Sequence, residues 1–237
     1  MRIYAFCRTT DDLGDESPDG TALQRLERWR NELEALFAGN PPVHPVLIAL
    51  QPTIERYAMP AQPFLDLIAA NVQDQQVTHY ATWDELLGYC RLSAAPVGRM
   101  VLRIFGVSGS RAEGLSDDVC IGLQLANHAQ DVSRDAAIGR RYLVDNDVQS
   151  TGSAGAAQVM VERARILLAS GEELERSVPP ALRLQLALYR LGGLAICDAI
   201  EGIGYKTEHE RPSVSASMKV SLVVRAALET FSRGRPA

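Results

Sequence analysis

The sequence predicts an all-α fold in which one domain, covering residues 1–237, holds about seven or eight helices. Apolar residues recur at steps of three and four along most of the chain, with charged residues between them, as on one face of a helix. The alternating β-branched runs and Asn-Gly turns that indicate strands and hairpins are missing from the sequence. The breaks between periodic segments are short and rich in Gly and Pro, so none of them indicates a domain linker.

The periodic segments predict the helices in chain order. The first helix lies within residues 4–16, and the second covers residues 21–37. Further segments of the same kind cover residues 64–77, 83–107, 119–136, 155–177, 181–204 and 216–231. Thr82 and Glu85 predict a capped start for the second of these further segments, and Ser116 predicts the N-cap of the third.

Charge and cysteine content exclude several classes of protein. The net charge is −5, from 24 basic and 29 acidic residues, so the overall field does not favour nucleic acid as a partner. The four cysteines are far apart and form no CxxC pair, which indicates buried thiols rather than a zinc site or a disulfide framework. The N-terminus carries no signal peptide, and no apolar run reaches the roughly 18 residues of a membrane span. We therefore expect a cytoplasmic protein, for which peripheral contact with a membrane stays open.

Acidic residues crowd near the N-terminus, in the stretch YAFCRTTDDLGDE. On a helix, Tyr4, Arg8, Asp11 and Asp15 follow steps of four, three and four and share one face, which we call the first polar stripe. Like charges four residues apart destabilise a helix by about 0.2–0.5 kcal/mol. A solvated helix face is the ordinary explanation for such a cluster, so the first polar stripe alone leaves function open.

A second set of polar residues follows helical spacing in the stretch LQLANHAQDVSRD. Gln124, Asn127, Asp131 and Asp135 form the second polar stripe, and the positions between them are largely apolar or small. Burying such carboxylates without cations is very costly. Mg²⁺ resolves the conflict, because it prefers oxygen ligands and binds through one or two carboxylates together with substrate phosphates. We therefore expect the two stripes to face one cavity and to bind Mg²⁺ and a diphosphate, with phosphate contacts from Arg8 and Arg140.

Both stretches resemble motifs of the squalene/phytoene synthase family. YAFCRTTDDLGDE is similar to the first aspartate-rich motif of this family, and LQLANHAQDVSRDAAIGRRYLV is similar to the second. YCRLSAAPVGRMVLRIFG resembles the helix whose small residues line the substrate channel, and DAIEGIGYKTEHERPSVSASMK resembles the C-terminal helices. The likeness extends over about residues 4–228, and it implies an isoprenoid-synthase helical bundle around a central cavity.

The resemblance also implies roles for individual residues. Asp11, Asp15, Asp131 and Asp135 match the catalytic aspartates that bind Mg²⁺, and Asn127 matches a further metal ligand. Substrate-binding positions match Tyr4, Arg8, Gln124, Asn127, Arg140, Tyr142 and Tyr205, and Lys219 and Arg211 are weaker matches.

Within the family, the sequence is most similar to the hydroxysqualene synthase branch of hopanoid biosynthesis. Gln130 stands where most relatives carry a basic residue, and Pro96 lies in the stretch SAAPVGR. The resemblance implies Mg²⁺-dependent conversion of presqualene diphosphate to hydroxysqualene, with release of diphosphate and no use of NADPH. The oligomeric state is left open.

Two departures and two alternatives accompany this interpretation. Val144 replaces a common proline, and the first motif begins almost at Met1, so we expect a chain that lacks the usual leading helix. A sibling reaction, the head-to-head condensation of farnesyl diphosphate to presqualene diphosphate, squalene or a phytoene-type product, is one alternative. A non-catalytic family member that acts as an assembly factor is the other, although a pure scaffold has no reason to keep four matched aspartates.

Overall fold

The computed structural model describes residues 2–15 and 20–232. Within these ranges the chain forms twelve α-helices and no strand, so the predicted all-α class is confirmed. The helices are α1 (Arg2–Asp15), α2 (Ala22–Phe37), α3 (Pro45–Tyr57), α4 (Gln62–Asp74), α5 (Trp83–Ser93), α6 (Ala95–Ile104), α7 (Ser110–Gln130), α8 (Val132–Ala137), α9 (Asp145–Ala169), α10 (Gly171–Ser177), α11 (Pro180–Gly202) and α12 (Ala216–Ser232).

The predicted number of helices is too low for the described residues, mainly because three predicted segments are divided. The segment over 83–107 breaks at Ala94, where Pro96 enters the first turn of α6 without a backbone N–H to continue the ladder. The segment over 119–136 breaks at Asp131, and the segment over 155–177 breaks at Ser170. Helix α3 was not predicted at all, although Pro45 stands in its first turn, where proline is favoured.

The two predicted caps have different outcomes. Thr82 and Glu85 form a complete capping box at the start of α5, as predicted. The N-cap expected at Ser116 is wrong, because α7 already begins at Ser110, after Gly109. Ser116 is instead buried in the middle of α7.

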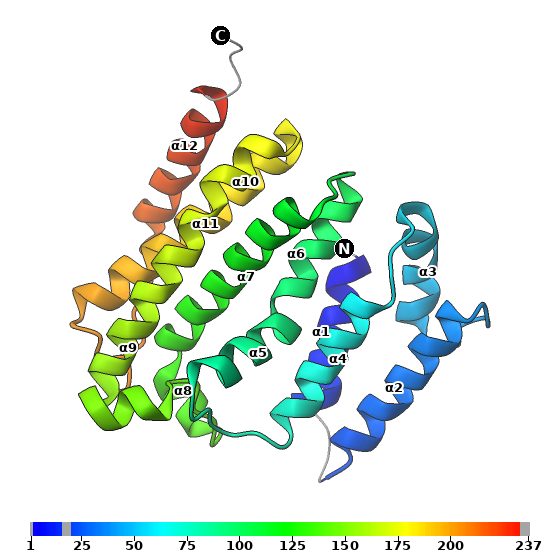
Figure 1. The fold of residues 1–237 in the computed structure, drawn as a ribbon, viewed down its shortest axis with the longest axis horizontal. Helices are drawn as coiled ribbons and strands as arrows, with labels where there is room; N and C mark the ends of the chain where they lie inside the picture. Colours follow the sequence, from blue (N-terminus) through cyan, green and yellow to red (C-terminus); the bar gives the residue numbers. More distant parts are fainter. Residues whose placement is uncertain (1, 16–19, 233–237) are drawn as a thin grey trace.

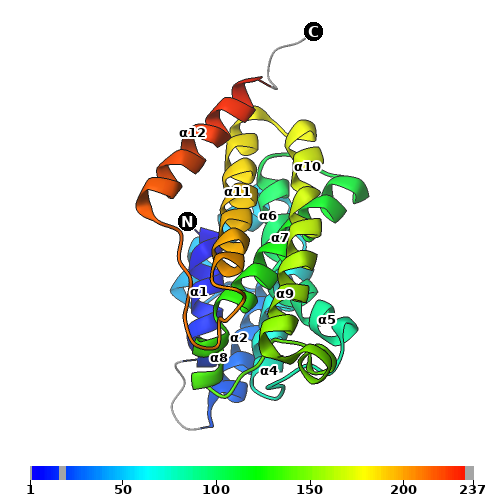
Figure 2. The same cartoon turned by 90° about the vertical axis from the view of Figure 1, so that its left-hand side faces the viewer.

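Helix α7 occupies the middle of the bundle and packs against α5, α6, α9, α10 and α11. In Figure 1, α1–α4 lie on one side of α5–α7, and α9–α12 lie on the other side. Figure 2 shows the same bundle from the side, with α8 at the lower end near the bottom of α7 and α9. The stretch that carries the first polar stripe therefore lies on one side of the bundle, and the stretch that carries the second begins in its middle.

A buried aromatic cluster fixes the orientation of α1. The ring of Phe6 stacks on Trp29 at a centroid distance of 5.3 Å and meets Phe64 edge-on at 5.1 Å. The indole N–H of Trp29 donates to Thr10 Oγ1 at 2.9 Å, and that hydroxyl donates to the carbonyl of Phe6 at 2.9 Å. With Phe6, Thr10 and Gly14 facing the core, Asp11 lies on the adjacent face of α1, where it accepts a hydrogen bond from Asn71 of α4.

Gly14 allows α1 and α4 to approach closely. A Cβ atom at this position would lie 2.9 Å from Oδ1 of Asn71, a distance shorter than Cβ atoms in proteins show to their neighbours. The residue after Gly14 is Asp15, so this close approach carries the acidic end of α1 to the C-terminal half of α4.

Two loops are joined at the end of the bundle. His79 and Arg141 form an isolated parallel bridge, and the backbone N–H of Arg141 donates to Thr78 O at 2.7 Å. His79 Nδ1 also lies 2.8 Å from Oδ2 of Asp145. This junction holds the segment after α8, with Arg140 and Tyr142, beside the C-terminal end of α4.

Helices α10, α11 and α12 meet around one buried guanidinium. The side chain of Arg190 is 2% exposed and lies 2.6 Å from Oε1 of Glu175, which is 1% exposed. Its Nη2 also lies 2.7 Å from Oε2 of Glu229 on α12. Such a network is expensive to break, because each remaining charge would stay in a poorly solvated place.

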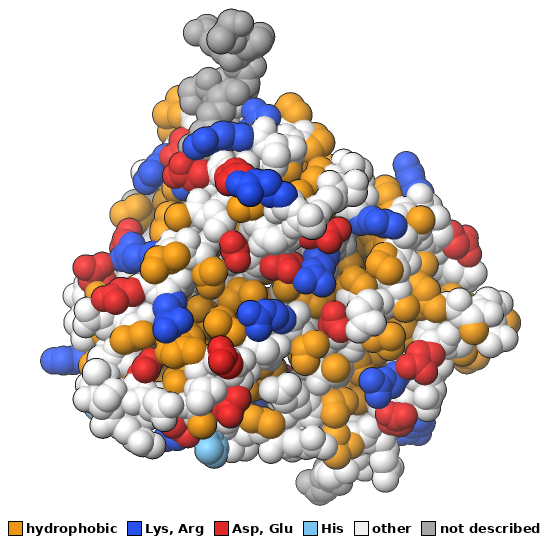
Figure 3. Space-filling view, viewed as in Figure 1, with side chains coloured by type: hydrophobic (Ala, Val, Ile, Leu, Met, Phe, Trp, Pro, Cys, Tyr) orange, Lys and Arg blue, Asp and Glu red, His pale blue; other side chains and the backbone are white. Residues whose placement is uncertain are grey.

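Acidic and basic side chains lie interspersed on the face shown in Figure 3, with hydrophobic side chains between them. Charge of one sign does not dominate this face. In the part of the chain that the structure describes, no helix combines the length and the apolar character needed to span a bilayer.

Candidate active site

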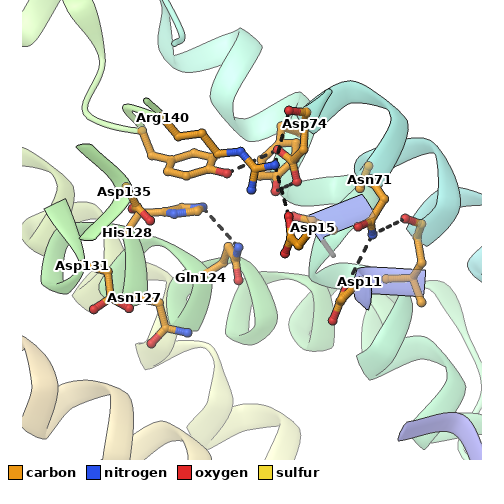
Figure 4. A pocket seen from close by; sticks show the side chains of 15 residues that line it. Asp11, Asp15, Asn71, Asp74, Gln124, Asn127, His128, Asp131, Asp135 and Arg140 are labelled. Carbon is orange, nitrogen blue, oxygen red and sulfur yellow. Dashed lines mark hydrogen bonds and ion pairs between the residues drawn. The ribbon is translucent and has the colours of Figure 1, made fainter. Parts of the chain in front are cut away.

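One pocket of about 340 Å³ receives side chains from both polar stripes. Figure 4 shows Asp11 and Asp15 on one side of this pocket and Asp131 and Asp135 on the other, with Arg140 and Asp74 together at one edge. The pocket is lined by Asp11, Asp15, Leu67, Ala70, Asn71, Asp74, Tyr89, Ser93, Gln124, Asn127, His128, Asp131, Asp135, Arg140 and Tyr142. Eight of the residues that the sequence selects are thus brought together, although they come from segments more than a hundred residues apart.

On α1, the two aspartates of the first polar stripe meet different partners. Asn71 Nδ2 donates to Oδ1 of Asp11 at 3.4 Å, and Arg140 Nη2 lies 3.3 Å from Oδ1 of Asp15. Burial raises the pKa of Asp11, and the nearby carboxylate of Asp15 adds to the rise. Asp11 therefore carries an anionic charge that its surroundings compensate poorly.

On α7 and α8, the second polar stripe shows the same imbalance. Burial raises the pKa of Asp135 to about 6, and the neighbouring Asp131 carboxylate adds to the rise. Asp131 itself pairs with the guanidinium of Arg211, whose Nη2 also donates to Gln130 Oε1 at 3.2 Å. Among the residues that the structure describes, neither Asp11 nor Asp135 forms an ion pair. A bound cation would satisfy both carboxylates.

Sequence reasoning missed an aromatic wall around Asp74. The hydroxyl of Tyr89 donates to Asp74 Oδ2 at 2.8 Å, and that of Tyr142 donates to Oδ1 at 3.3 Å. Burial and the charge of Asp74 raise the pKa of Tyr89, so its hydroxyl keeps the proton that it donates. Of this group, the resemblance selected Tyr142 but neither Tyr89 nor Asp74. The pair Asn71 and Asp74, three residues apart at the polar end of a largely apolar helix, was a further signal.

His128 belongs to the same wall. Its ring stacks on Tyr142 at a centroid distance of 3.7 Å, and its Nε2 lies 3.2 Å from Nε2 of Gln124. Burial lowers the pKa of His128 to about 3, so the imidazole is neutral near pH 7. The ring therefore adds polarity to the pocket without adding positive charge.

Three selected residues do not line the pocket. Tyr4 is 73% exposed, and Arg8 forms a 2.7 Å ion pair with Asp12 on the same helix. Both share the face of Asp11, but they lie one to two turns before it, beyond the end of the pocket. Tyr205 follows α11 with a φ of 61° and packs against the core cluster around α7 and α9. A part for these residues in binding stays a prediction.

The two weaker candidates also differ in position. Arg211 reaches the rim of the pocket through Asp131, because Gln130 Nε2 donates to Pro212 O at 2.8 Å and holds this loop against the end of α7. Lys219 is exposed on α12.

The donor set of the pocket fits a hard divalent cation bound jointly with a polyanion. Carboxylate and amide oxygens dominate the lining, as Mg²⁺ prefers. Within the described residues, no group of three His, Cys, Asp or Glu side chains lies close enough together to hold a metal ion by itself. An ion here would therefore take one or two ligands from Asp11, Asp15, Asn127, Asp131 or Asp135, and the rest from phosphate and water oxygens.

Comparisons with known proteins agree on one family. The family model described as squalene/phytoene synthase matches residues 1–218. A phytoene synthase of Arthrospira platensis is 31% identical over 95% of this chain and 82% of its own length. A hydroxysqualene synthase of Rhodopseudomonas palustris is 36% identical over 65% of this chain, and the alignment spans 52% of that relative.

Solved structures show the same relationship. The crystal structure of squalene synthase HpnC from Alicyclobacillus acidocaldarius superposes with a TM-score of 0.82 at 44% identity, covering 86% of this chain and 82% of that one. A dehydrosqualene synthase in complex with a ligand superposes with a TM-score of 0.85 at 22% identity, covering 98% of this chain and 86% of that one. At that identity the second match speaks for the fold alone.

Proposed function

Because this chain belongs to the squalene/phytoene synthase family, we propose that it converts presqualene diphosphate to hydroxysqualene with the aid of Mg²⁺ and releases diphosphate. This choice is supported by the resemblance of the sequence to the hydroxysqualene synthase branch and by the relatives that carry that name. The squalene synthase structure at 44% identity supports it as well. The observation that carries it is the meeting of Asp11 and Asp15 with Asp131 and Asp135 at one pocket.

The first step is departure of the diphosphate. The carbon–oxygen bond breaks and both electrons leave with the diphosphate oxygen, so negative charge grows at the mouth of the pocket. Mg²⁺, when bound by the aspartates, stabilises that charge. Arg140 lies at the same place with a guanidinium suited to two phosphate oxygens, and it needs only to exchange its contact with Asp15 for a contact with substrate.

The second step takes place against the aromatic and apolar wall. The neutral ring of His128 and the rings of Tyr89 and Tyr142 line the pocket and stack on one another, so they offer a carbocation an aromatic surface without a strong base. Aromatic rings attract positive charge, which favours a cation held long enough to rearrange. Capture by water then gives the alcohol, and no hydride donor is required.

The main competitor is a condensation of the phytoene synthase type. The phytoene synthase of Arthrospira platensis aligns with 95% of this chain, more than the hydroxysqualene synthases do. Such an enzyme would begin from prenyl diphosphates and would not require water as a nucleophile. A non-catalytic scaffold is less well supported, because it has no use for a pocket that gathers these carboxylates.

The test is to incubate the purified protein with presqualene diphosphate and Mg²⁺, with and without NADPH. We expect hydroxysqualene and free diphosphate in both samples, and loss of both products after chelation by EDTA. Squalene formed only with NADPH would overturn the proposal, as would the absence of any turnover. Parallel incubation with farnesyl or geranylgeranyl diphosphate detects the condensation reaction.

We further propose peripheral contact with membranes, because the expected product is a long hydrocarbon with one hydroxyl. Sedimentation with phospholipid vesicles tests this contact, and a protein that stays in the supernatant with and without product would contradict it.

A further inference from the structure

Ser93 carries a buried hydroxyl in the wall of the pocket. It is the last residue of α5, and its Oγ makes no hydrogen bond to any group that the structure describes. Serine near the end of a helix commonly bonds back to the carbonyl four residues earlier. Buried polar atoms without a partner are uncommon in native proteins, and each calls for an explanation.

The other hydroxyls of the wall are engaged. Of the described residues that line the pocket, only Tyr89, Tyr142 and Ser93 carry a hydroxyl, and both tyrosines donate to Asp74. Ser93 is therefore the hydroxyl of this set that has no hydrogen-bond partner among the described groups.

The location of Ser93 separates it from the carboxylates. It lies one turn beyond Tyr89 on α5, and Leu67 lies one turn before Asn71 on α4. Tyr89 and Asn71 contact aspartates directly, whereas Ser93 and Leu67 line the pocket without such contacts. A pocket wall that contains an unpartnered hydroxyl and an apolar side chain is suited to a single water near a hydrocarbon, because a buried water needs polar partners to stay.

We propose that Ser93 positions the water that captures the carbocation in the reaction proposed above, on which this inference rests. Ser93 Oγ accepts a hydrogen bond from the water and thereby turns a water lone pair toward the cation. That lone pair forms the new carbon–oxygen bond, and the extra proton passes from the oxonium to the departed diphosphate. Presqualene diphosphate and water thus become hydroxysqualene and protonated diphosphate, and Ser93 is unchanged.

Replacement by alanine separates the two steps. S93A should release diphosphate within about 3-fold of the wild-type rate, because the aspartates and Arg140 are untouched. The fraction of alcohol among the products should fall at least about 5-fold, in favour of hydrocarbons formed when the cation loses a proton. S93T keeps the hydroxyl and should restore most of the alcohol.

A matched control is available at Thr207. Its Oγ1 is also buried without a partner among the described groups, but Thr207 does not line the pocket. T207V should therefore leave the product ratio unchanged, which shows that loss of a buried hydroxyl alone does not redirect the reaction. Thermal unfolding of each variant establishes that the proteins compared are folded.

The experiment distinguishes two failures. Wild-type reactions in ¹⁸O-labelled water should place the label in the alcohol. If the wild-type protein forms no labelled alcohol, both the proposed function and this inference are wrong. A labelled wild type with an unchanged alcohol fraction in folded S93A overturns the role of Ser93 alone, and so does an equal loss of alcohol in S93A and T207V.

Discussion

The guanidinium of Arg140 lies 3.3 Å from the carboxylate of Asp15, although 125 positions separate the two residues in the chain. The same Nη2 lies 3.4 Å from the carbonyl of Asp74. One side chain therefore joins the end of α1, the end of α4 and the segment after α8, at the place where we expect a diphosphate.

Replacing Arg140 by lysine should weaken substrate binding. R140K keeps the charge but loses the planar fork that engages two oxygens at once, so we expect KM for presqualene diphosphate to rise about 10-fold. Steady-state kinetics of diphosphate release measure this effect. R141K is the control, because Arg141 pairs with Asp145 and does not line this pocket. Equal changes in both variants would contradict the assignment.

Neighbouring aspartates on α1 offer a sharper comparison. Asp11 lines the pocket, whereas Asp12 pairs with Arg8 outside it. D11N should lower kcat by at least about 100-fold, because it removes a cation ligand from the leaving group. D12N removes only an exposed ion pair and should change the free energy of unfolding by less than about 1 kcal/mol, with little effect on rate. A D11N enzyme that turns over like D12N would refute the metal-binding prediction.

The buried guanidinium of Arg190 should dominate the stability of the α10–α12 region. R190M leaves Glu175 buried without this cation, for which we expect a loss on the order of 3–5 kcal/mol in the free energy of unfolding. Denaturant titration followed by circular dichroism measures the loss. R225M removes an arginine that is 62% exposed and also pairs with Glu229, so it should cost less than about 1 kcal/mol. Similar losses would mean that burial does not set the strength of this network.

The same network predicts a dependence of stability on pH. Burial acts to raise the pKa of Glu229, but hydrogen bonds from Arg225 and Arg190 outweigh it and hold the pKa below its ordinary value of 4.5. The carboxylate therefore contributes stability that is present above 4.5 and is lost as the pH falls through the lower folded-state pKa. E229Q should lose less stability than the wild type between about pH 5 and pH 3, measured by urea unfolding. Parallel pH profiles for the two proteins would contradict the prediction.

The helical class and both polar stripes could be predicted from sequence because each depends on local spacing. A carboxylate four residues from another shares its helix face wherever that helix packs, so the stripes of α1, α7 and α8 were visible in advance. The end of the first stripe was not visible. Tyr4 and Arg8 share the correct face but lie beyond the pocket, because its length depends on where α4 crosses α1, beside Gly14 and Asn71.

The aromatic wall could not be predicted for the same physical reason. Tyr89, His128 and Tyr142 have no common spacing, and they meet only because α5, α7 and the segment after α8 converge on Asp74. Helix breaks at Ala94 and Asp131 were also missed, since apolar periodicity continues through both. The aromatic wall depends on where helices distant in the sequence cross, and the helix breaks depend on local turns. Neither can be predicted from apolar periodicity.

The pocket takes its aspartates from α1, α4, α8 and the single residue between α7 and α8, whereas Ser93 belongs to α5. Substitutions at Ser93 can therefore accumulate without removing a hydrogen bond to the carboxylates of the pocket, whereas Tyr89 on the same helix has to stay because it donates to Asp74. After a gene duplication, one copy can drift toward a different terpene skeleton while keeping its ancestral turnover. On this architecture, new products would emerge before catalytic competence is lost, and diversity among descendants should concentrate at position 93.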